Sequence, residues 1–460
     1  MRKIAGLLSL VVAFGTVAGF AADQKVFLKS TTHGTAVRGA IPMKGPDHYS
    51  FARLKAQNHL SARMNQLIQQ QQKGAAFHNC SGFISIPCFS SWFITGYRNS
   101  VYSYSMIGHS PKAGGTTSIP NEVIPLELQL IGPDNVTVIY DQDPSAPQDL
   151  GLSDVSLLTQ GPIWNDTTTY PGGGGLPADT GQFVDTTFRA SFHGVKAANW
   201  HTPLDPPTFP TKHYVGQLFY NNGDWACFNG ELPPCTSFQV VNINSISNIF
   251  EQILSPTQED PPSTEVPFIL TDFVTAFIPN NGGCCVLGFH SAQPGNEGGN
   301  SVLVWGWATY IPQSSNNPFA PFGYDSFVSS HEMSELYHDP FVQTTGTLVS
   351  PWVDGSASFG QANLETGDAI EAMKDVDSDY HVPLVTTGGA CTYHTQNEAL
   401  LPWFTRNPKA PQQGPGPGVY SWPNTNTLNN GHPCVTQGFV YGEGPAGFVF
   451  DDGSSTGQCH

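Results

Sequence analysis

The stretch that decides the fold is His331-Glu332-Met333-Ser334-Glu335-Leu336-Tyr337-His338. A helix is expected from Ser326 to His338, because the residue before Pro340 leaves the helical region. Positions i, i+4 and i+7 of a helix share a face, so His331, Glu335 and His338 should point the same way. Two polar ligands one helical turn apart are typical of zinc peptidase helices.

This spacing predicts a role for each side chain. His331 and Glu335 are expected to bind Zn²⁺, and Glu332, directly after the first ligand, is the expected catalytic general base. His338 is an alternative third ligand. Glu335 stands where such helices usually carry a second histidine, and its negative charge should weaken the ion as a Lewis acid. A histidine with two carboxylates would also accept Mn²⁺ or Fe²⁺.

The same residues allow a structural interpretation. Ser329-x-x-Glu332 matches a capping box, which would start the helix and leave Glu332 bonded to backbone N–H groups. The helix would then be a scaffold with a solvated polar face. His290 and His394 lie in apolar or aromatic surroundings near a cysteine, and both are expected to be core or loop histidines.

A second metal is considered at Asp375-Val376-Asp377-Ser378-Asp379, where carboxylates alternate as in a calcium loop. Tyr380 and Thr386 stand where an EF-hand needs Gly and Glu, so only a loose structural Ca²⁺ site remains. Gly453-Ser454-Ser455-Thr456-Gly457 matches a nucleophile elbow. Too few residues follow it to form the required helix, so a catalytic Ser455 is not expected.

Downstream, Leu364-Glu365-Thr366-Gly367-Asp368 resembles the acidic pair of gluzincin peptidases. That resemblance implies that Glu365 is the third zinc ligand and that Asp368 lies in the second shell and orients a ligand histidine.

Several stretches also resemble a group of secreted, mostly bacterial, zincin-like proteins, and distantly the plant exordium-type proteins. They are Gln182-Phe183-Val184-Asp185, Arg189-Ala190-Ser191-Phe192, Cys284 to Ser291, the His331-Glu332-x-x-Glu335 helix with Asp339-Pro340-Phe341, Pro351-Trp352, and Asn363-Leu364-Glu365-x-Gly367-Asp368. The resemblance covers roughly residues 180 to 405. It implies a zincin-like core with His331, Glu332, Glu335 and Glu365 at the site. The sequence departs from the group at Gly360, near which the group has a cysteine, and at His338, where it has Asn.

Composition sets the broad class. The chain has 460 residues, of which 12% are charged and 12% aromatic, too apolar for a disordered protein. With 48 Gly and 38 Pro it should form short strands joined by many turns. A net charge of -18 opposes binding to nucleic acid or to anionic membranes. The predicted fold class is α+β, a zincin-like metalloprotein core with a β-rich body.

The N-terminus predicts export. Met1-Arg2-Lys3 is positive, an apolar stretch runs to Phe20, and Gly19-Phe20-Ala21 is a small-x-small cleavage site. Residues 1–21 are therefore expected to be a signal peptide, and the mature protein to be secreted, extracellular or periplasmic, without a membrane span.

Four regions are predicted along the chain. Residues 22–79 should hold an amphipathic helix from Asp47 to Lys73, 80–407 the β-rich zincin-like domain, and 408–460 a Pro/Gly-rich loop and hairpin. Strands are expected at 83–86, 136–140 and 302–305, and a helix at 246–254. The segment 341–400 is expected to be loop-rich and acidic.

Nine cysteines in an exported chain should mostly form disulfides. Cys80 with Cys88, and Cys227 with Cys235, are spaced to close small loops. Cys284 and Cys285 are expected to pair with two of Cys391, Cys434 and Cys459 rather than with each other.

Together these patterns predict a secreted zinc-dependent hydrolase, of metallopeptidase type, that acts on a protein or peptide. The alternative is a non-enzymatic exported surface protein that binds glycans or proteins and keeps a structural or degenerate metal site.

Overall fold

The computed structural model describes residues 24–32, 34–36, 41, 80–94, 101–147, 151–172, 176–193, 195–279, 283–312, 324–342, 348–354, 360–368, 379–386, 389–404, 421–423 and 439–441. The expected signal peptide, the expected helix from Asp47 to Lys73, Ser455 and the calcium candidate apart from Asp379 lie outside them. No helix among the described residues has the length and apolar character needed to cross a membrane.

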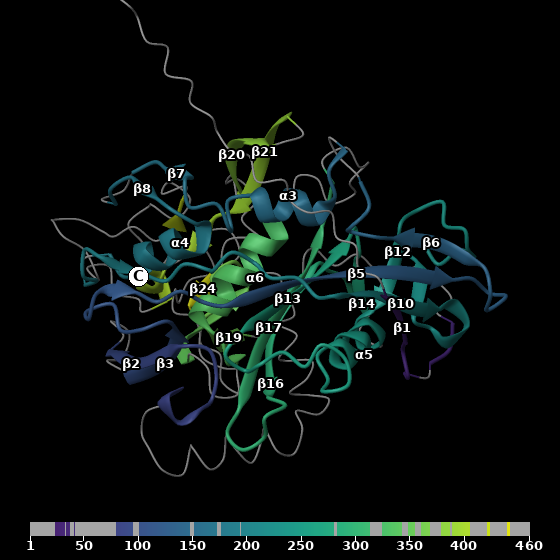
Figure 1. Cartoon of the computed structure of the whole chain (residues 1–460), viewed down its shortest axis with the longest axis horizontal. Coiled ribbons are helices and arrows are strands. Elements are labelled where there is room, and N and C mark those ends of the chain that lie inside the picture. Colours follow the sequence, from purple (N-terminus) through teal and green to yellow (C-terminus); the bar gives the residue numbers. More distant parts are fainter. Residues whose placement is uncertain are drawn as a thin grey trace, which may run out of the picture.

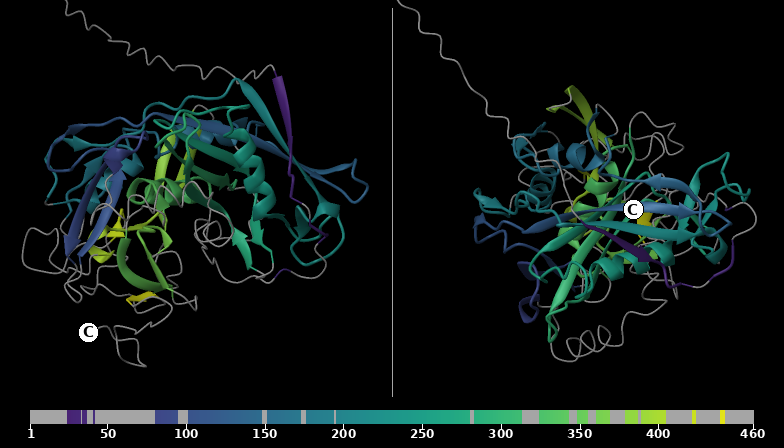
Figure 2. Two further views of the ribbon diagram at one scale, coloured as in Figure 1. Left: turned by 90° about the horizontal axis from the view of Figure 1, so that it is seen from below. Right: turned by 45° about the vertical axis from the view of Figure 1, so that its right-hand side comes forward.

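A seven-stranded mixed sheet occupies the centre of the molecule (Figure 1). Its order is β1 (Gln24–Lys29), β10 (Lys212–Phe219), β5 (Asn121–Ile131), β13 (Val266–Asp272), β17 (Val302–Tyr310) and β16 (Gly288–Pro294), with β6 (Val138–Gln142) also on β5. The first five strands run parallel, whereas β16 and β6 are antiparallel to their neighbours. Figure 2 shows β1 at the outer edge of this sheet.

The helices that matter most are α4 (Phe183–Ser191), α5 (Ile243–Ile253) and α6 (Phe327–His338). The helix expected near 246–254 and the one expected from Ser326 to His338 are both confirmed. Strands combined with helices also confirm the α+β class. The expected strands at 136–140 and 302–305 are present as β6, shifted by two residues, and as the start of β17.

The two faces of the sheet carry different helices. Along β17, Val304 and Ala308 belong to the core beneath α6, whereas Leu303, Trp305 and Trp307 belong to the core beneath α5. Because successive side chains of a strand point to opposite faces, α6 and α5 lie on opposite sides of the same strands.

Helix α6 is buried along its whole length, and all twelve of its residues are inaccessible. A helix buried all round belongs to the interior of a protein. It begins at Phe327 with Ser326 as N-cap, and the N–H of Asp339 closes it on the carbonyl of Glu335. Ser329 therefore lies inside the helix, so the capping-box interpretation and the solvated polar face are both wrong.

Smaller elements surround this centre. They are β2 (Cys88–Ile94), β3 (Val101–Ile107), β4 (Gly115–Thr116), β7 (Thr169–Tyr170), β8 (Asp179–Thr180), β9 (Trp200–His201), β11 (Trp225–Cys227), β12 (Gln239–Asn242), β14 (Ala276–Ile278), β15 (Gly283–Val286), β18 (Leu348–Asp354), β19 (Gly360–Asn363), β20 (Asp379–Thr386), β21 (Gly389–Gln396), β22 (Glu398–Ala399), β23 (Ser421–Trp422) and β24 (Phe439–Tyr441), with α3 (Asp154–Gln160), α9 (Leu401–Phe404) and the 3-10 turns η1 (Cys80–Gly82) and η3 (Tyr220–Asn222).

Two sequence expectations fail among these elements. Residues 83–86 form no strand; Ile84 makes a single bridge to Ser301. The described residues of 341–400 are largely strands, β18 to β22, rather than loop, and the β20–β21 hairpin stands beside α6 (Figure 1). From the C-terminal region, β23 pairs with β22 and β24 with β18.

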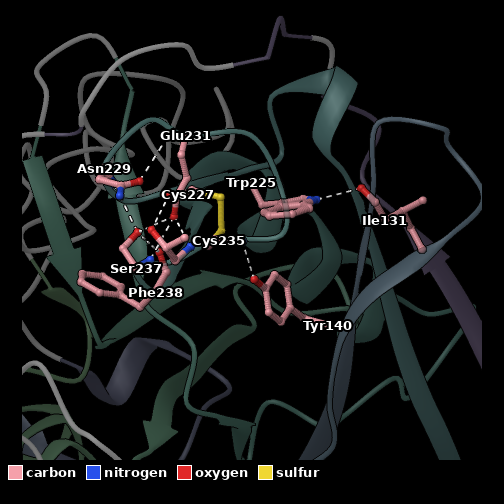
Figure 3. The surroundings of a disulfide bond; sticks show 10 residues. Ile131, Tyr140, Trp225, Cys227, Asn229, Glu231, Cys235, Ser237 and Phe238 are labelled. Carbon is pink, nitrogen blue, oxygen red and sulfur yellow. Dashed lines mark hydrogen bonds between the residues drawn. A yellow bond between two sulfur atoms is a disulfide. The ribbon is translucent and has the colours of Figure 1, made fainter.

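Three disulfides join described cysteines. Cys80–Cys88 and Cys227–Cys235 are confirmed. Figure 3 shows the second of these beside Trp225. The Tyr140 hydroxyl accepts a hydrogen bond from the N–H of Cys235. The expectation for Cys284 and Cys285 is wrong, because they are bonded to each other. Both lie in strand β15, and the small buried cluster around them contains no other cysteine among the described residues.

Candidate metal centre

Three elements bring acidic and histidine side chains to one buried point. Helix α6 supplies His331, Glu332 and Glu335, and strand β16 supplies His290. The turn after β19 supplies Glu365 and Asp368. Each of these six side chains belongs to a residue at most 5% exposed. Burial of this many ionisable groups costs free energy unless opposite charges or ligands compensate it.

The hydrogen bonds of His331 fix how its ring is protonated. The amide of Gln396, at the end of β21, donates from Nε2 to the carbonyl of Gly367 at 2.8 Å. Its Oε1 therefore faces His331 Nδ1, at 2.6 Å, and must accept a hydrogen bond from it. His331 Nε2 then points at Glu335 Oε2, 3.2 Å away. Either a proton or a metal ion has to lie between these two atoms.

Glu335 is held as an anion. Its Oε1 accepts hydrogen bonds from the backbone N–H groups of Gly367, at 3.0 Å, and Asp368, at 3.2 Å. Burial alone raises the pKa of Glu335, but His331 and then His290 outweigh it and hold the pKa at about 2. Gly367 permits this arrangement, because any Cβ at that position would meet the His331 ring.

Glu332 and His290 face each other across the gap between α6 and β16. His290 Nδ1 is 3.6 Å from both Glu332 Oε2 and Glu335 Oε2. Gly288 lets the helix approach, since a Cβ there would lie 2.7 Å from Glu332 Cγ. Burial raises the pKa of Glu332, and the bond to His290 only partly offsets this.

The two downstream acids lie near different histidines of the cluster. Asp368 Oδ1 is 3.6 Å from His331 Nε2. Glu365 Oε2 lies 3.8 Å from His290 Nε2 instead. Burial, followed by the charges of Glu335 and Asp368, raises the pKa of Glu365 well above its usual range. Asp368, expected only to orient a ligand, thus stands with His331 and Glu335, while the expected ligand Glu365 contacts His290 and Glu335.

The structure places His338 away from this cluster. Its Nδ1 donates to the carbonyl of Ser334 at 2.8 Å, and its Nε2 lies 2.9 Å from the hydroxyl of Ser191 on α4. Burial lowers the pKa of His338 to about 4, so the ring is neutral. With both nitrogens hydrogen bonded, His338 is a packing residue between α4 and α6 and has no nitrogen left for a metal.

Sequence reasoning missed His290, Gln396 and Glu398. His290 was expected to be a satisfied core histidine, yet its Nε2 has no hydrogen-bond partner. The alternation of side chains along a strand could have revealed His290. If Phe289 faces the apolar core, its neighbours Gly288 and His290 face the opposite side of the sheet, toward α6. His394 behaves as expected, because its Nδ1 bonds Asp325 Oδ2 at 2.6 Å. Gln396 and Glu398, the latter fully buried beside Ser334 and Thr366, gave no sequence signal.

The donor set fits a divalent cation. His331 Nε2, Glu335 and Asp368 offer ligand atoms within 4.8 Å of one another, as do His290, Glu332 and Glu335. Imidazole with carboxylates suits Zn²⁺, Mn²⁺ and Fe²⁺. The unpartnered Nε2 of His290 is a further sign that the described side chains do not satisfy this cluster by themselves.

Two other groupings fit a metal less well. Cys227 and Cys235 lie near Glu231, but their sulfurs are bonded to each other (Figure 3). Glu127 lies near Asp143 and His213, but the ammonium group of Lys25 already contacts Glu127 Oε2 at 2.8 Å. The α6 cluster is therefore the candidate functional site. Comparison of the chain with protein-family models, with curated proteins and with solved structures found no match.

Proposed function

We propose that this protein is a divalent-metal-dependent hydrolase, of metallopeptidase type, whose site is the α6 cluster. The observation that carries the proposal is the position of His331 Nε2, which lies 3.2 Å from Glu335 Oε2 and 3.6 Å from Asp368 Oδ1 within a buried group of acids. A metal bonded to His331 Nε2 and Glu335 Oε2 at about 2.1 Å would match their separation. The zincin-like fold expected from the sequence belongs to the same proposal.

In this proposal, His331, Glu335 and Asp368 hold the ion. An ion there would polarise a substrate carbonyl and make a bound water more acidic. Glu332 takes the proton from the attacking water and passes it to the leaving amine. Its raised pKa, caused by burial, suits a group that must accept a proton near neutral pH. Gln396 orients His331, and the Gly367 and Asp368 amides orient Glu335.

The disulfides support an oxidising compartment as the setting of this protein. Six described cysteines form three disulfides, which persist outside the reducing cytosol. We therefore propose a secreted or periplasmic protein that hydrolyses proteins or peptides.

One observation favours a second candidate, a non-enzymatic exported binding protein with a structural metal site. All six cluster residues are at most 5% exposed, so the described residues leave little room for a substrate. A structural metal would hold α6, β16 and the turn after β19 together.

Metal analysis of the purified protein separates these candidates. We expect at least one zinc or manganese per chain in the parent, and its loss in His331→Ala and Glu335→Ala. Glu332→Gln should keep metal but lose hydrolysis of a peptide library by about 10²-fold or more. Metal without any hydrolysis in the parent would leave the structural candidate. A metal-free parent, even after reconstitution, would refute both.

A further inference from the structure

The cluster contains two ligand groups rather than one. The first consists of His290, Glu332 and Glu335, and the second of His331, Glu335 and Asp368. Within each group, the ligand atoms lie within 4.8 Å of one another. Ligand atoms bound to one ion at about 2.1 Å are separated by roughly 3 to 4 Å, so each group has the size of one cation site.

Glu335 belongs to both groups through a single oxygen. Its Oε2 is 3.2 Å from His331 Nε2 and 3.6 Å from His290 Nδ1. Its other oxygen is already bonded to the Gly367 and Asp368 amides. A carboxylate oxygen shared between two ligand groups is the arrangement of a bridging ligand.

Glu332 also spans the two groups. Its Oε2 is 3.6 Å from His290 Nδ1, and its Oε1 is 3.9 Å from His331 Nε2. The carboxylate that would accept the proton therefore lies between the two ligand groups. In enzymes with two metals, the ions are about 3.5–4 Å apart and hold the reacting oxygens between them.

A single ion bound by His331, Glu335 and Asp368 would not account for the position of His290. The residue is 5% exposed, Nδ1 faces Glu332 and Glu335, and Nε2 has no hydrogen-bond partner. Glu365 Oε2 lies 3.8 Å from Nε2, and the Glu365 carboxyl also contacts Glu335. Nδ1 can bind an ion while Nε2–H points to Glu365, the carboxylate–histidine–metal order found in many metal sites.

We infer that the α6 cluster is a binuclear centre that holds two divalent cations bridged by Glu335. The inference rests on the metal site of the proposed function and adds a second ion to it. His290 with Oε2 of Glu332 holds one ion, which leaves Oε1 of Glu332 as the proton acceptor, and His331 with Asp368 holds the other. Among the described residues, Glu332 and Glu335 form ion pairs with histidines alone. Two bound cations would therefore also compensate the negative charge of these carboxylates.

Metal stoichiometry tests the inference. The purified protein is stripped with chelator and dialysed against Mn²⁺ alone, and bound Mn²⁺ is counted by elemental analysis. We expect two ions per chain in the parent and an exchange-coupled Mn²⁺ pair in its electron paramagnetic resonance spectrum. His290→Ala and Asp368→Ala should each bind one ion and show an uncoupled spectrum. His394→Ala, which removes a histidine paired with Asp325 outside the cluster, should keep two.

The outcomes distinguish this inference from the proposed function. One ion in the parent, lost in Asp368→Ala but kept in His290→Ala, refutes the second site and leaves the proposed function standing. No bound ion refutes both. Near-ultraviolet circular dichroism checks that each variant folds. If an alanine variant does not fold, His290→Gln and Asp368→Asn replace it, with the same expected count of one.

Discussion

The two faces of the central sheet differ although they come from the same strands. On the α5 face, Phe250 packs against Phe289, Trp305 and Trp307, with ring centroids 5.5–6.0 Å apart. On the α6 face, the neighbouring residue His290 meets carboxylates instead. Both faces remove apolar area from water and stabilise the fold, but the α6 face also buries charge, which costs stability unless something compensates it. The α6 face therefore combines an apolar core with the candidate metal site.

The largest effect should come from the apolar face. Phe289→Ala removes a ring that touches Phe250, Trp305 and Trp307, and should lower the free energy of unfolding by about 3–5 kcal/mol. Urea denaturation measures it. Val136→Ala, at a side chain 79% exposed, is the matched control and should change stability by less than about 0.5 kcal/mol. A loss below about 1 kcal/mol in Phe289→Ala would contradict this view of the α5 face.

The second largest effect should come from metal binding on the α6 face, where a cation would compensate the buried carboxylates. Zn²⁺ or Mn²⁺ at a hundred times its dissociation constant should raise the free energy of unfolding by about 2.7 kcal/mol per bound ion. The gain should shrink as the pH falls, because the ligands must be deprotonated to bind metal. Thermal unfolding with and without chelator measures this. Phe289→Ala, if folded, should show the same gain, and His331→Ala should lose most of it; equal gains in both would show that the ion binds elsewhere.

The faces also differ in how far the sequence could predict them. The α6 helix and the proximity of His331 to Glu335, the candidate ligand pair, followed from spacing within one helix. The partners from other elements did not, because His290 and Gln396 reach the site through strand pairing, which is a long-range property. His290 appeared to belong to an apolar strand, and only the alternation set by Phe289 shows that it faces α6.

The cysteines show both what sequence spacing can predict and where it fails. Cys80–Cys88 and Cys227–Cys235 close short loops, so local spacing was enough to predict them. Cys284 and Cys285 were expected to find distant partners, but both lie in β15 and bond to each other. The wrong prediction thus concerned a local pair, because spacing alone did not distinguish a bond between two adjacent cysteines from bonds to distant ones.

A third effect concerns the pKa of Glu122, a carboxyl at the edge of the α5 face. Burial, and then the charges of Glu259 and Glu265, raise the pKa of Glu122 from 4.5 to about 8. A carboxyl whose pKa is raised by folding favours the folded state at low pH. This contribution is complete below the unfolded pKa of 4.5 and is lost as the pH rises through about 8.

Glu122→Gln should remove this pH dependence. At pH 8.5 the variant should be about 2 kcal/mol more stable than the parent, a figure reduced to allow for solvent screening, and at pH 4 the two should be alike. Urea denaturation across that range measures the difference. Glu251→Gln, at an exposed position of α5, is the control and should follow the parent at every pH. A difference between Glu122→Gln and the parent that does not vary with pH would show that Glu122 does not titrate as described.

The smallest effect tests whether His338 belongs to the metal-binding cluster on α6. Ser191→Ala removes the hydroxyl that lies 2.9 Å from His338 Nε2 and leaves that nitrogen buried without its partner. We expect a loss of about 1–2 kcal/mol in the free energy of unfolding and no change in bound metal. The reason is that His338 holds α4 against α6, while the ligand atoms lie on the side of α6 that faces β16. Elemental analysis measures the bound metal, and urea denaturation measures the stability. A loss of metal in Ser191→Ala would indicate that His338 is a metal ligand, contrary to its assignment as a packing residue.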